Sequence, residues 1–336
     1  MGVKVSCRIH SIKMTKFDST DGVLSTIVDA RVRMLSTKPG IPASFAKVLS
    51  VLVCMATAGF AEDSRSKVAP SNPQAPQLSA KEIVRRAMEH DISNWQQETN
   101  YTFIQRIEER ELNGDGSEKS SKSQTEEIIF LYGQPYAHLI RRDDKPLSDS
   151  EARKVERKLN DTMEKRRNES PADREKRLAE FQKRHQEEHE FLREVPEAYD
   201  FRILGEETVN GRSAYVIAGE PRSDFRPNLN AARVLPKLRP KLWIDKDGYQ
   251  WLKMEAEVID TITWGGFLLR LHSGSHIELE QGPVNNELWL TSHVHVSFDA
   301  RVALVKSIRM DIEAKIGDFK KFRTDSRVIS VQEVQH

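Results

Sequence analysis

The chain has 336 residues, a length that allows one large β domain or two ordinary domains. Charged residues make up 31% and hydrophobic residues 38%, which supports a core but implies some segments that are nearly all surface. The 52 Lys and Arg residues balance 51 Asp and Glu residues to a net charge of +1, and the two signs are interspersed. The basic excess typical of nucleic-acid-binding proteins is absent, so we expect no nucleic-acid partner.

A secretory signal peptide is predicted close to the N terminus. After Met34, two lysines precede an apolar run that starts at Val48, and small residues follow up to Ala61. The run is shorter than the roughly 20 residues of a membrane span, although an uncleaved anchor is the alternative interpretation. We expect cleavage near Ala61 and a periplasmic mature protein. Residues 1–33 lack this layout, so Met34 is a candidate translation start.

Both cysteines lie before the predicted cleavage site. Cys54 follows Val53 rather than the small residue that lipidation requires, and it lies within the apolar run. Cleavage near Ala61 would also remove Cys7. The mature chain is then expected to have no disulfide, no cysteine metal site and no cysteine nucleophile.

The mature chain is predicted to begin with a linker and a helix. Residues 62–78 are rich in Pro, Ser, Gln and Lys, a composition typical of a flexible linker. Ser79 and Glu82 form a capping box before an apolar stripe of helical spacing, which predicts an amphipathic helix from Ala80 to Gln96. We assign residues 1–61 to the N-terminal extension and signal peptide, and 79–336 to one β domain.

Strands are predicted after this helix. Apolar and polar residues alternate from Tyr101, and an Asn-Gly-Asp-Gly turn ends the strand at residues 113–116. Further strands at 126–132 and 136–142 extend this antiparallel meander.

Residues 146–196 interrupt the strand pattern with a highly charged stretch. Ser148 begins one predicted helix with a capping box, and Ser170 followed by Pro171 begins a second. Their apolar stripes are narrow, which indicates a helical hairpin that touches the sheet with one edge and adds little to the main core.

The strand pattern then resumes and ends in a long hairpin, for a total of about ten or eleven strands. We expect its turn at residues 282–285, with Gln281 facing Asn286 and His272 opposite His295. Apolar residues occupy one face of this hairpin, and charged residues and histidines occupy the other.

Two groups of residues invite a metal site. The segment His185 to His189 reads HQEEH, which fits the H-x-x-E-H pattern of inverted zinc peptidases, but it lies in a charged run where chance matches are common. Four histidines share the polar face of the long hairpin, namely His272, His276, His293 and His295. Surface histidines on a polar strand face are the commoner explanation of this second pattern, and the sequence has no nucleophile or phosphate-binding motif. We expect no catalytic residue, no bound metal and no cofactor, and hence no enzyme.

The order of elements resembles the periplasmic lipoprotein-carrier superfamily, the LolA/LolB-like proteins. The residues that carry this resemblance are Leu242 to Asp245, which read LWID, and Gly317 to Val328, which read GDFKKFRTDSRV. The resemblance implies a mainly β fold, an open and curved antiparallel half-barrel with the N-terminal helix on its concave side. It also implies binding of acyl chains, or a sensor role like that of RseB-like relatives. The charged insertion departs from the carrier pattern.

We therefore predict an exported envelope protein that binds a lipid or lipoprotein acyl chain as a carrier or a sensor, with envelope proteins as a second class of partner. The predicted cleft lies between the first helix and the sheet. Its expected lining is Phe103, Phe130, Leu269, Leu271, Ile277, Val294, Val296 and Phe298. An ordinary core, a protein-interaction module without a ligand and a zinc-dependent hydrolase are the alternatives.

Overall fold

The structure, a computed structural model, describes residues 78–264, 269–302 and 306–322. The predicted signal peptide and residues 62–77 of the predicted linker lie outside the described residues. The helical elements are α3 (Ala80–Glu98), α4 (Asp149–Arg167), α5 (Pro171–Ala198) and the 3-10 helix η2 (Ala231–Lys237). The strands are β1 (Tyr101–Leu112), β2 (Glu118–Leu131), β3 (Gln134–Arg142), β4 (Lys145–Pro146), β5 (Tyr199–Val209), β6 (Arg212–Pro221), β7 (Leu238–Asp245), β8 (Trp251–Val258), β9 (Ile262–Trp264), β10 (Leu269–Leu271), β11 (His276–Val284), β12 (Leu288–Val302) and β13 (Lys306–Lys321).

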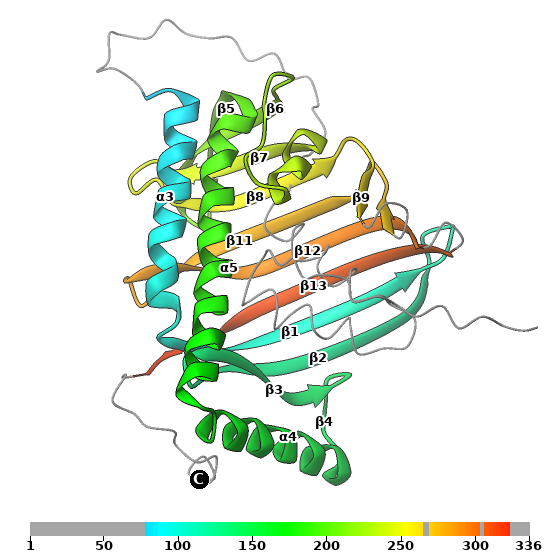
Figure 1. Ribbon diagram of the computed structural model, residues 1–336. Helices are drawn as coiled ribbons and strands as arrows, with labels where there is room; N and C mark the ends of the chain where they lie inside the picture. Colours follow the sequence, from blue (N-terminus) through cyan, green and yellow to red (C-terminus); the bar gives the residue numbers. More distant parts are fainter. Residues whose placement is uncertain (1–77, 265–268, 303–305, 323–336) are drawn as a thin grey trace, which may run out of the picture.

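All thirteen described strands belong to one antiparallel sheet. Its main order is β4-β3-β2-β1-β13-β12-β11-β8-β7-β6-β5, and β10 pairs with both β12 and β9. The first and last strands pair in the middle of the sheet, where Ile107 lies opposite Ala314. The edges β4 and β5 do not pair with each other, so the sheet is open and curved, with α3 and α5 on its concave side (Figure 1). This confirms the predicted fold class; the described strands outnumber the prediction, and three of them have only two or three residues.

The start of each helix and several hairpin turns follow from local sequence. The Ser79 hydroxyl accepts a hydrogen bond from the Glu82 backbone N–H, and Ser148 and Glu151 form the predicted capping box. Asn210 and Gly211 both have positive φ in the β5–β6 hairpin, as a type I′ turn requires. No described helix is long and apolar enough to cross a membrane.

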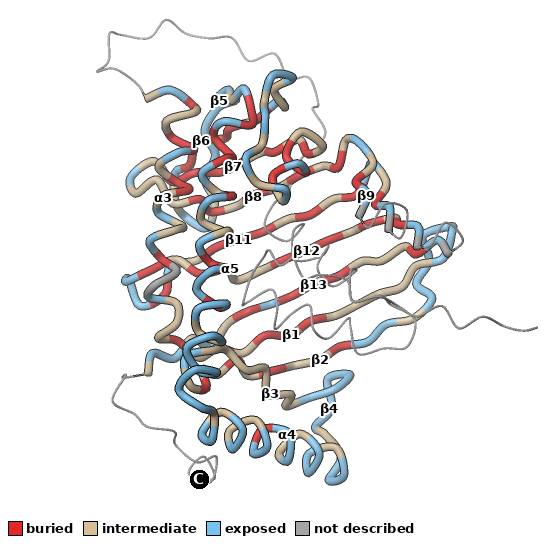
Figure 2. The backbone as a smooth tube through the Cα atoms, viewed as in Figure 1, coloured by how far each residue is buried: buried red, intermediate tan, exposed pale blue. Residues whose placement is uncertain are grey.

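One face of the sheet carries the main core, and we call it the inner face because α3 and α5 pack on it. Buried and less buried residues alternate along β1, β11 and β12 (Figure 2). Ile83, Val84, Ala87 and Met88 of α3 pack in this core. The sequence periodicity thus identified the buried face of the long hairpin correctly.

The second helix of the charged insertion is part of the main core, which corrects the expectation that the insertion adds little to it. Phe191 and Val195 near the end of α5 are buried in the main cluster, and α5 lies beside α3 (Figure 1). In α4, by contrast, only Leu159 is buried. The narrow apolar stripes correctly predicted that most of the insertion is exposed. The C-terminal part of α5 is buried because it packs beside α3, a helix that is distant in sequence.

The turn of the long hairpin lies three residues later than predicted. Asn285 and Asn286 have φ of 52° and 55°, and Gln281 lies opposite Thr291 rather than Asn286. Two consecutive asparagines suit the left-handed central positions of a turn, which the hydrogen bond from the Glu287 N–H to the Val284 carbonyl closes. Pro283 fits within β11 because the pairing of β11 with β8 ends at Glu280, so its missing N–H faces no partner strand.

Candidate functional site

The inner face of β10 to β13 forms a continuous row of apolar side chains, which we call the apolar wall. Its residues face each other across the strands: Val296 lies between Ile277 and Ile312, and Val294 lies between Leu279 and Ala314. All six side chains are buried in one cluster. These aliphatic side chains, most of them β-branched, pack against their cross-strand neighbours in the antiparallel sheet.

Most residues predicted to line a cleft are brought together in this cluster. They are Phe103, Leu271, Ile277, Val294, Val296 and Phe298. Phe130 is half-buried and lies outside the cluster, with its ring centroid 6.3 Å from that of Phe322. The backbone of Leu269 lies in β10, but its side chain is outside the described part of the structure.

Two helices, rather than the single predicted one, cover the inner face, and they cross the strands near one end (Figure 1). The short strand β9 lies at the opposite end (Figure 1), and β10 pairs with it. There Leu271 pairs with Ala300 of β12 and with Ile262 of β9, and all three side chains are buried. The apolar wall therefore continues beyond the two helices.

A half-buried carboxyl group on α3 attaches this helix to the sheet. Asp91 accepts hydrogen bonds from Trp251 Nε1 at 3.0 Å and Gln281 Nε2 at 2.8 Å. Burial raises the pKa of Asp91, and the two hydrogen bonds oppose this shift only in part. The spacing of α3 indicated its buried stripe, but no sequence pattern identified this anchor.

A buried carboxyl lies on the inner face, between β1 and β2. Gln105 Nε2 donates a hydrogen bond of 2.9 Å to Glu126, and both side chains are buried. Burial raises the pKa of Glu126 to about 7, while the Gln105 hydrogen bond and the charge of Lys158 on α4 lower it less. This carboxyl is therefore protonated over part of the neutral pH range.

The HQEEH segment lies on α5, where its side chains contact one another. His185 Nδ1 lies 3.0 Å from Glu188 Oε2, and the buried His185 ring packs edge-on against Phe181. Burial, followed by the charge of His185, lowers the pKa of His189. Among the described residues, neither His185 nor His189 belongs to a group of three His, Cys, Asp or Glu side chains close enough to share a metal ion. The described structure therefore gives no zinc-ligand set to support the zinc-hydrolase alternative.

The outer-face histidines are not arranged as predicted, because the hairpin register differs. The His272 backbone N–H bonds to the Asp299 carbonyl, and Glu278 rather than His272 lies opposite His295. Carboxylates adjoin the histidines: His295 Nε2 lies 2.9 Å from Asp311, and His293 lies opposite Glu280. Sequence reasoning missed Glu278 and Glu280, although their alternation with the apolar residues of β11 placed them on this face.

Comparisons with known proteins give similarity only among solved structures. No family model matches the chain. No curated protein matches it either.

Three solved structures illustrate the similarity. A putative outer membrane lipoprotein-sorting protein domain from Vibrio parahaemolyticus is 12% identical, with a TM-score of 0.30, over 73% of this chain and 95% of that one. A LolA superfamily protein from Nitrosomonas europaea is 11% identical, with a TM-score of 0.26, over 74% of this chain and 95% of that one. A structure of the MucA/MucB complex from Pseudomonas aeruginosa is 13% identical, with a TM-score of 0.20, over 72% of this chain and 98% of that one. The fold is established by this chain's own strand order.

Proposed function

We propose that the mature protein is exported to the periplasm and binds a lipid or lipoprotein acyl chain on the inner face of the sheet, as a carrier or a sensor. The observation that supports this proposal is the apolar wall, which continues past α3 and α5 to Leu271 and Ala300. An acyl chain has no polar group along its length, so it needs a long apolar surface rather than a set of hydrogen-bond partners.

Export is a separate part of the proposal and has its own test. The layout after Met34 motivates it, and removal of residues 1–61 leaves every described strand and helix in the mature chain. We expect N-terminal sequencing of the protein from an envelope fraction to start at Glu62 or Gly59. An intact Met34 or Met1 terminus in a cytosolic fraction would contradict export.

Acyl-chain binding is tested by denaturing the purified protein and identifying released lipids by mass spectrometry. The informative variant is Ala300→Leu, because Ala300 is fully buried at the far end of the apolar wall. If an acyl chain occupies this end, the larger side chain should displace it and leave the thermal melt unchanged or higher. If the end is a close-packed core, the same change should destabilise the fold by about 1–3 kcal/mol.

A matched control is Arg301→Leu, which introduces the same side chain at an exposed neighbouring position on the other face. It should alter neither the lipid content nor the melt. Absence of acyl chains from the wild-type protein, together with a lower melting temperature for Ala300→Leu, would overturn the proposal and favour an interaction module with an ordinary core.

A further inference from the structure

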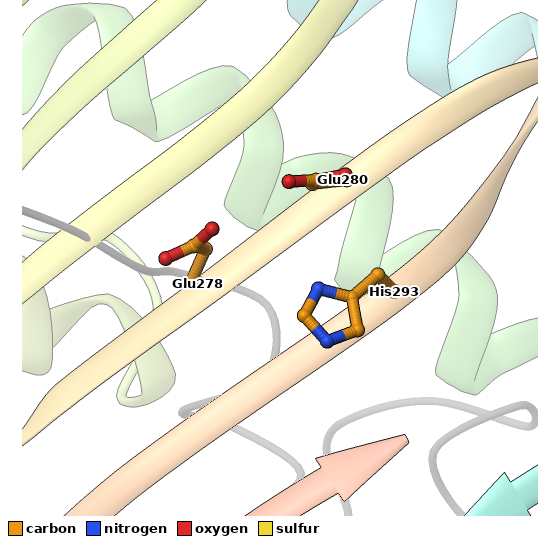
Figure 3. Close-up of side chains that lie close together, drawn as sticks. All are labelled: Glu278, Glu280 and His293. Carbon is orange, nitrogen blue, oxygen red and sulfur yellow. The ribbon is translucent and has the colours of Figure 1, made fainter. Parts of the chain in front are cut away.

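Three potential metal ligands meet on the outer face of the sheet, away from the apolar wall. Glu278 and Glu280 are two residues apart on β11, so their side chains share one face, and His293 of β12 lies directly opposite Glu280. One ligand atom from each of the three side chains lies within 4.8 Å of the others. Figure 3 shows the two carboxylates and the imidazole around a common space.

The neighbours of His293 orient its ring for metal binding. His293 Nε2 lies 3.3 Å from Glu313 Oε1 on β13, an arrangement in which Nε2 carries the proton and its N–H donates a hydrogen bond to the carboxylate. Nδ1 is then the nitrogen with a free electron pair. A carboxylate that holds the second nitrogen of a metal-binding histidine is a common feature of protein metal sites.

The two glutamates differ in how their charge is compensated. Lys253 Nζ on β8 lies 2.7 Å from Glu278 and 2.9 Å from Glu255, so it is shared between two carboxylates. In the part of the chain that the structure describes, no side chain donates a hydrogen bond to the Glu280 carboxylate or forms an ion pair with it. Glu280 is half-buried beside Glu278, and Lys253, which lies opposite it on β8, directs its ammonium group to the other two carboxylates.

We propose that Glu278, Glu280 and His293 bind a divalent zinc ion across β11 and β12. An imidazole nitrogen with two carboxylate oxygens is a donor set that Zn²⁺ accepts, whereas Ca²⁺ and Mg²⁺ favour oxygen ligands alone. Zn²⁺ would neutralise the charge of Glu280 and leave a coordination position open on the outer face. The site is independent of acyl-chain binding, because its side chains point to the opposite face of the sheet.

The test is a calorimetric titration of ZnCl₂ into tag-free protein that has been stripped with EDTA. We expect about one equivalent to bind, and both Glu280→Gln and His293→Gln to weaken binding by at least about tenfold. Zn²⁺ should raise the melting temperature of the wild type and should not raise that of either variant. Without metal, Glu280→Gln should melt like the wild type or above it, because no described partner is lost.

Three further variants make the assignment specific. Lys253→Met should strengthen Zn²⁺ binding, because it removes the cation that competes for Glu278. His295→Gln, on the same face of β12, and His189→Gln, in the HQEEH segment, should leave it unchanged. The proposal is overturned if the wild type binds no Zn²⁺, if Glu280→Gln and His293→Gln bind it normally, or if either control variant loses it equally.

Discussion

The side-chain amide of Gln281 on β11 donates a hydrogen bond of 2.8 Å to the carboxylate of Asp91 on α3. These residues are 190 positions apart in the chain. Their contact joins the helix that covers the inner face to the strand that carries part of the apolar wall. A helix joined to the sheet by partly buried hydrogen bonds has a defined position, because any shift leaves these groups without partners.

Replacement of Asp91 by Ala should destabilise the fold by about 1–3 kcal/mol, because Gln281 Nε2 and Trp251 Nε1 would lose their acceptor. Urea unfolding followed by tryptophan fluorescence measures this loss. Asp91→Asn is the matched control, since it retains an oxygen acceptor and should be less destabilising. Equal losses for both variants would show that the two hydrogen bonds contribute little.

Glu126→Gln should change how stability depends on pH. Burial raises the pKa of Glu126 from 4.5 to about 7 in the folded protein. Between these values the folded state binds more protons than the unfolded state, so this group's contribution to stability falls as pH rises from 4.5 to 7. Above pH 7, ionisation destabilises the wild type by on the order of 3 kcal/mol.

Glu126→Gln removes this titration and retains a polar group that can bond to Gln105. The variant should therefore match the wild type at about pH 4.5 and exceed its stability at about pH 8. Urea melts of both proteins at the two pH values give the difference directly. A stability difference that does not change with pH would contradict the raised pKa.

Phe191→Ala should cost about 3–5 kcal/mol of stability, the usual loss for truncating a fully buried phenylalanine. Glu190→Ala is the matched control, because this neighbouring side chain on α5 is exposed, and its effect should stay within about 0.5 kcal/mol. Chemical unfolding of both variants compares them. A small effect of Phe191→Ala on stability would show that α5 contributes little to the main core.

Asn286 tests the position of the β11–β12 turn. Its φ of 55° lies in the left-handed region, which a β-branched residue adopts at a cost of about 1–2 kcal/mol. Asn286→Val should therefore destabilise the fold by about that amount, whereas Asn286→Gly should be neutral or stabilising. Thermal melts separate the two. Equal melting temperatures for Asn286→Val and Asn286→Gly would show that Asn286 does not occupy a left-handed turn position.

The amino-acid sequence alone determined the features that depend on neighbouring residues. The capping serines of α3, α4 and α5 marked three helix starts, and the alternation in β12 identified Val294, Val296 and Phe298 as buried. These features follow from side-chain periodicity and from the few residues that suit a cap, and both act within one or two turns of chain.

Only the tertiary structure decided the relationships between distant segments. The local sequence allows a turn at Gly282 to Asn285 as well as one at Asn285 and Asn286. The structure has the second turn, which moves His272 away from His295 and places Glu280 opposite His293. Phe191 is buried where α5 packs beside α3, and the hydrogen-bond donors to Asp91 come from β8 and β11. Strand register and helix docking are set by the sum of many contacts across the sheet, so no short stretch of sequence contains them.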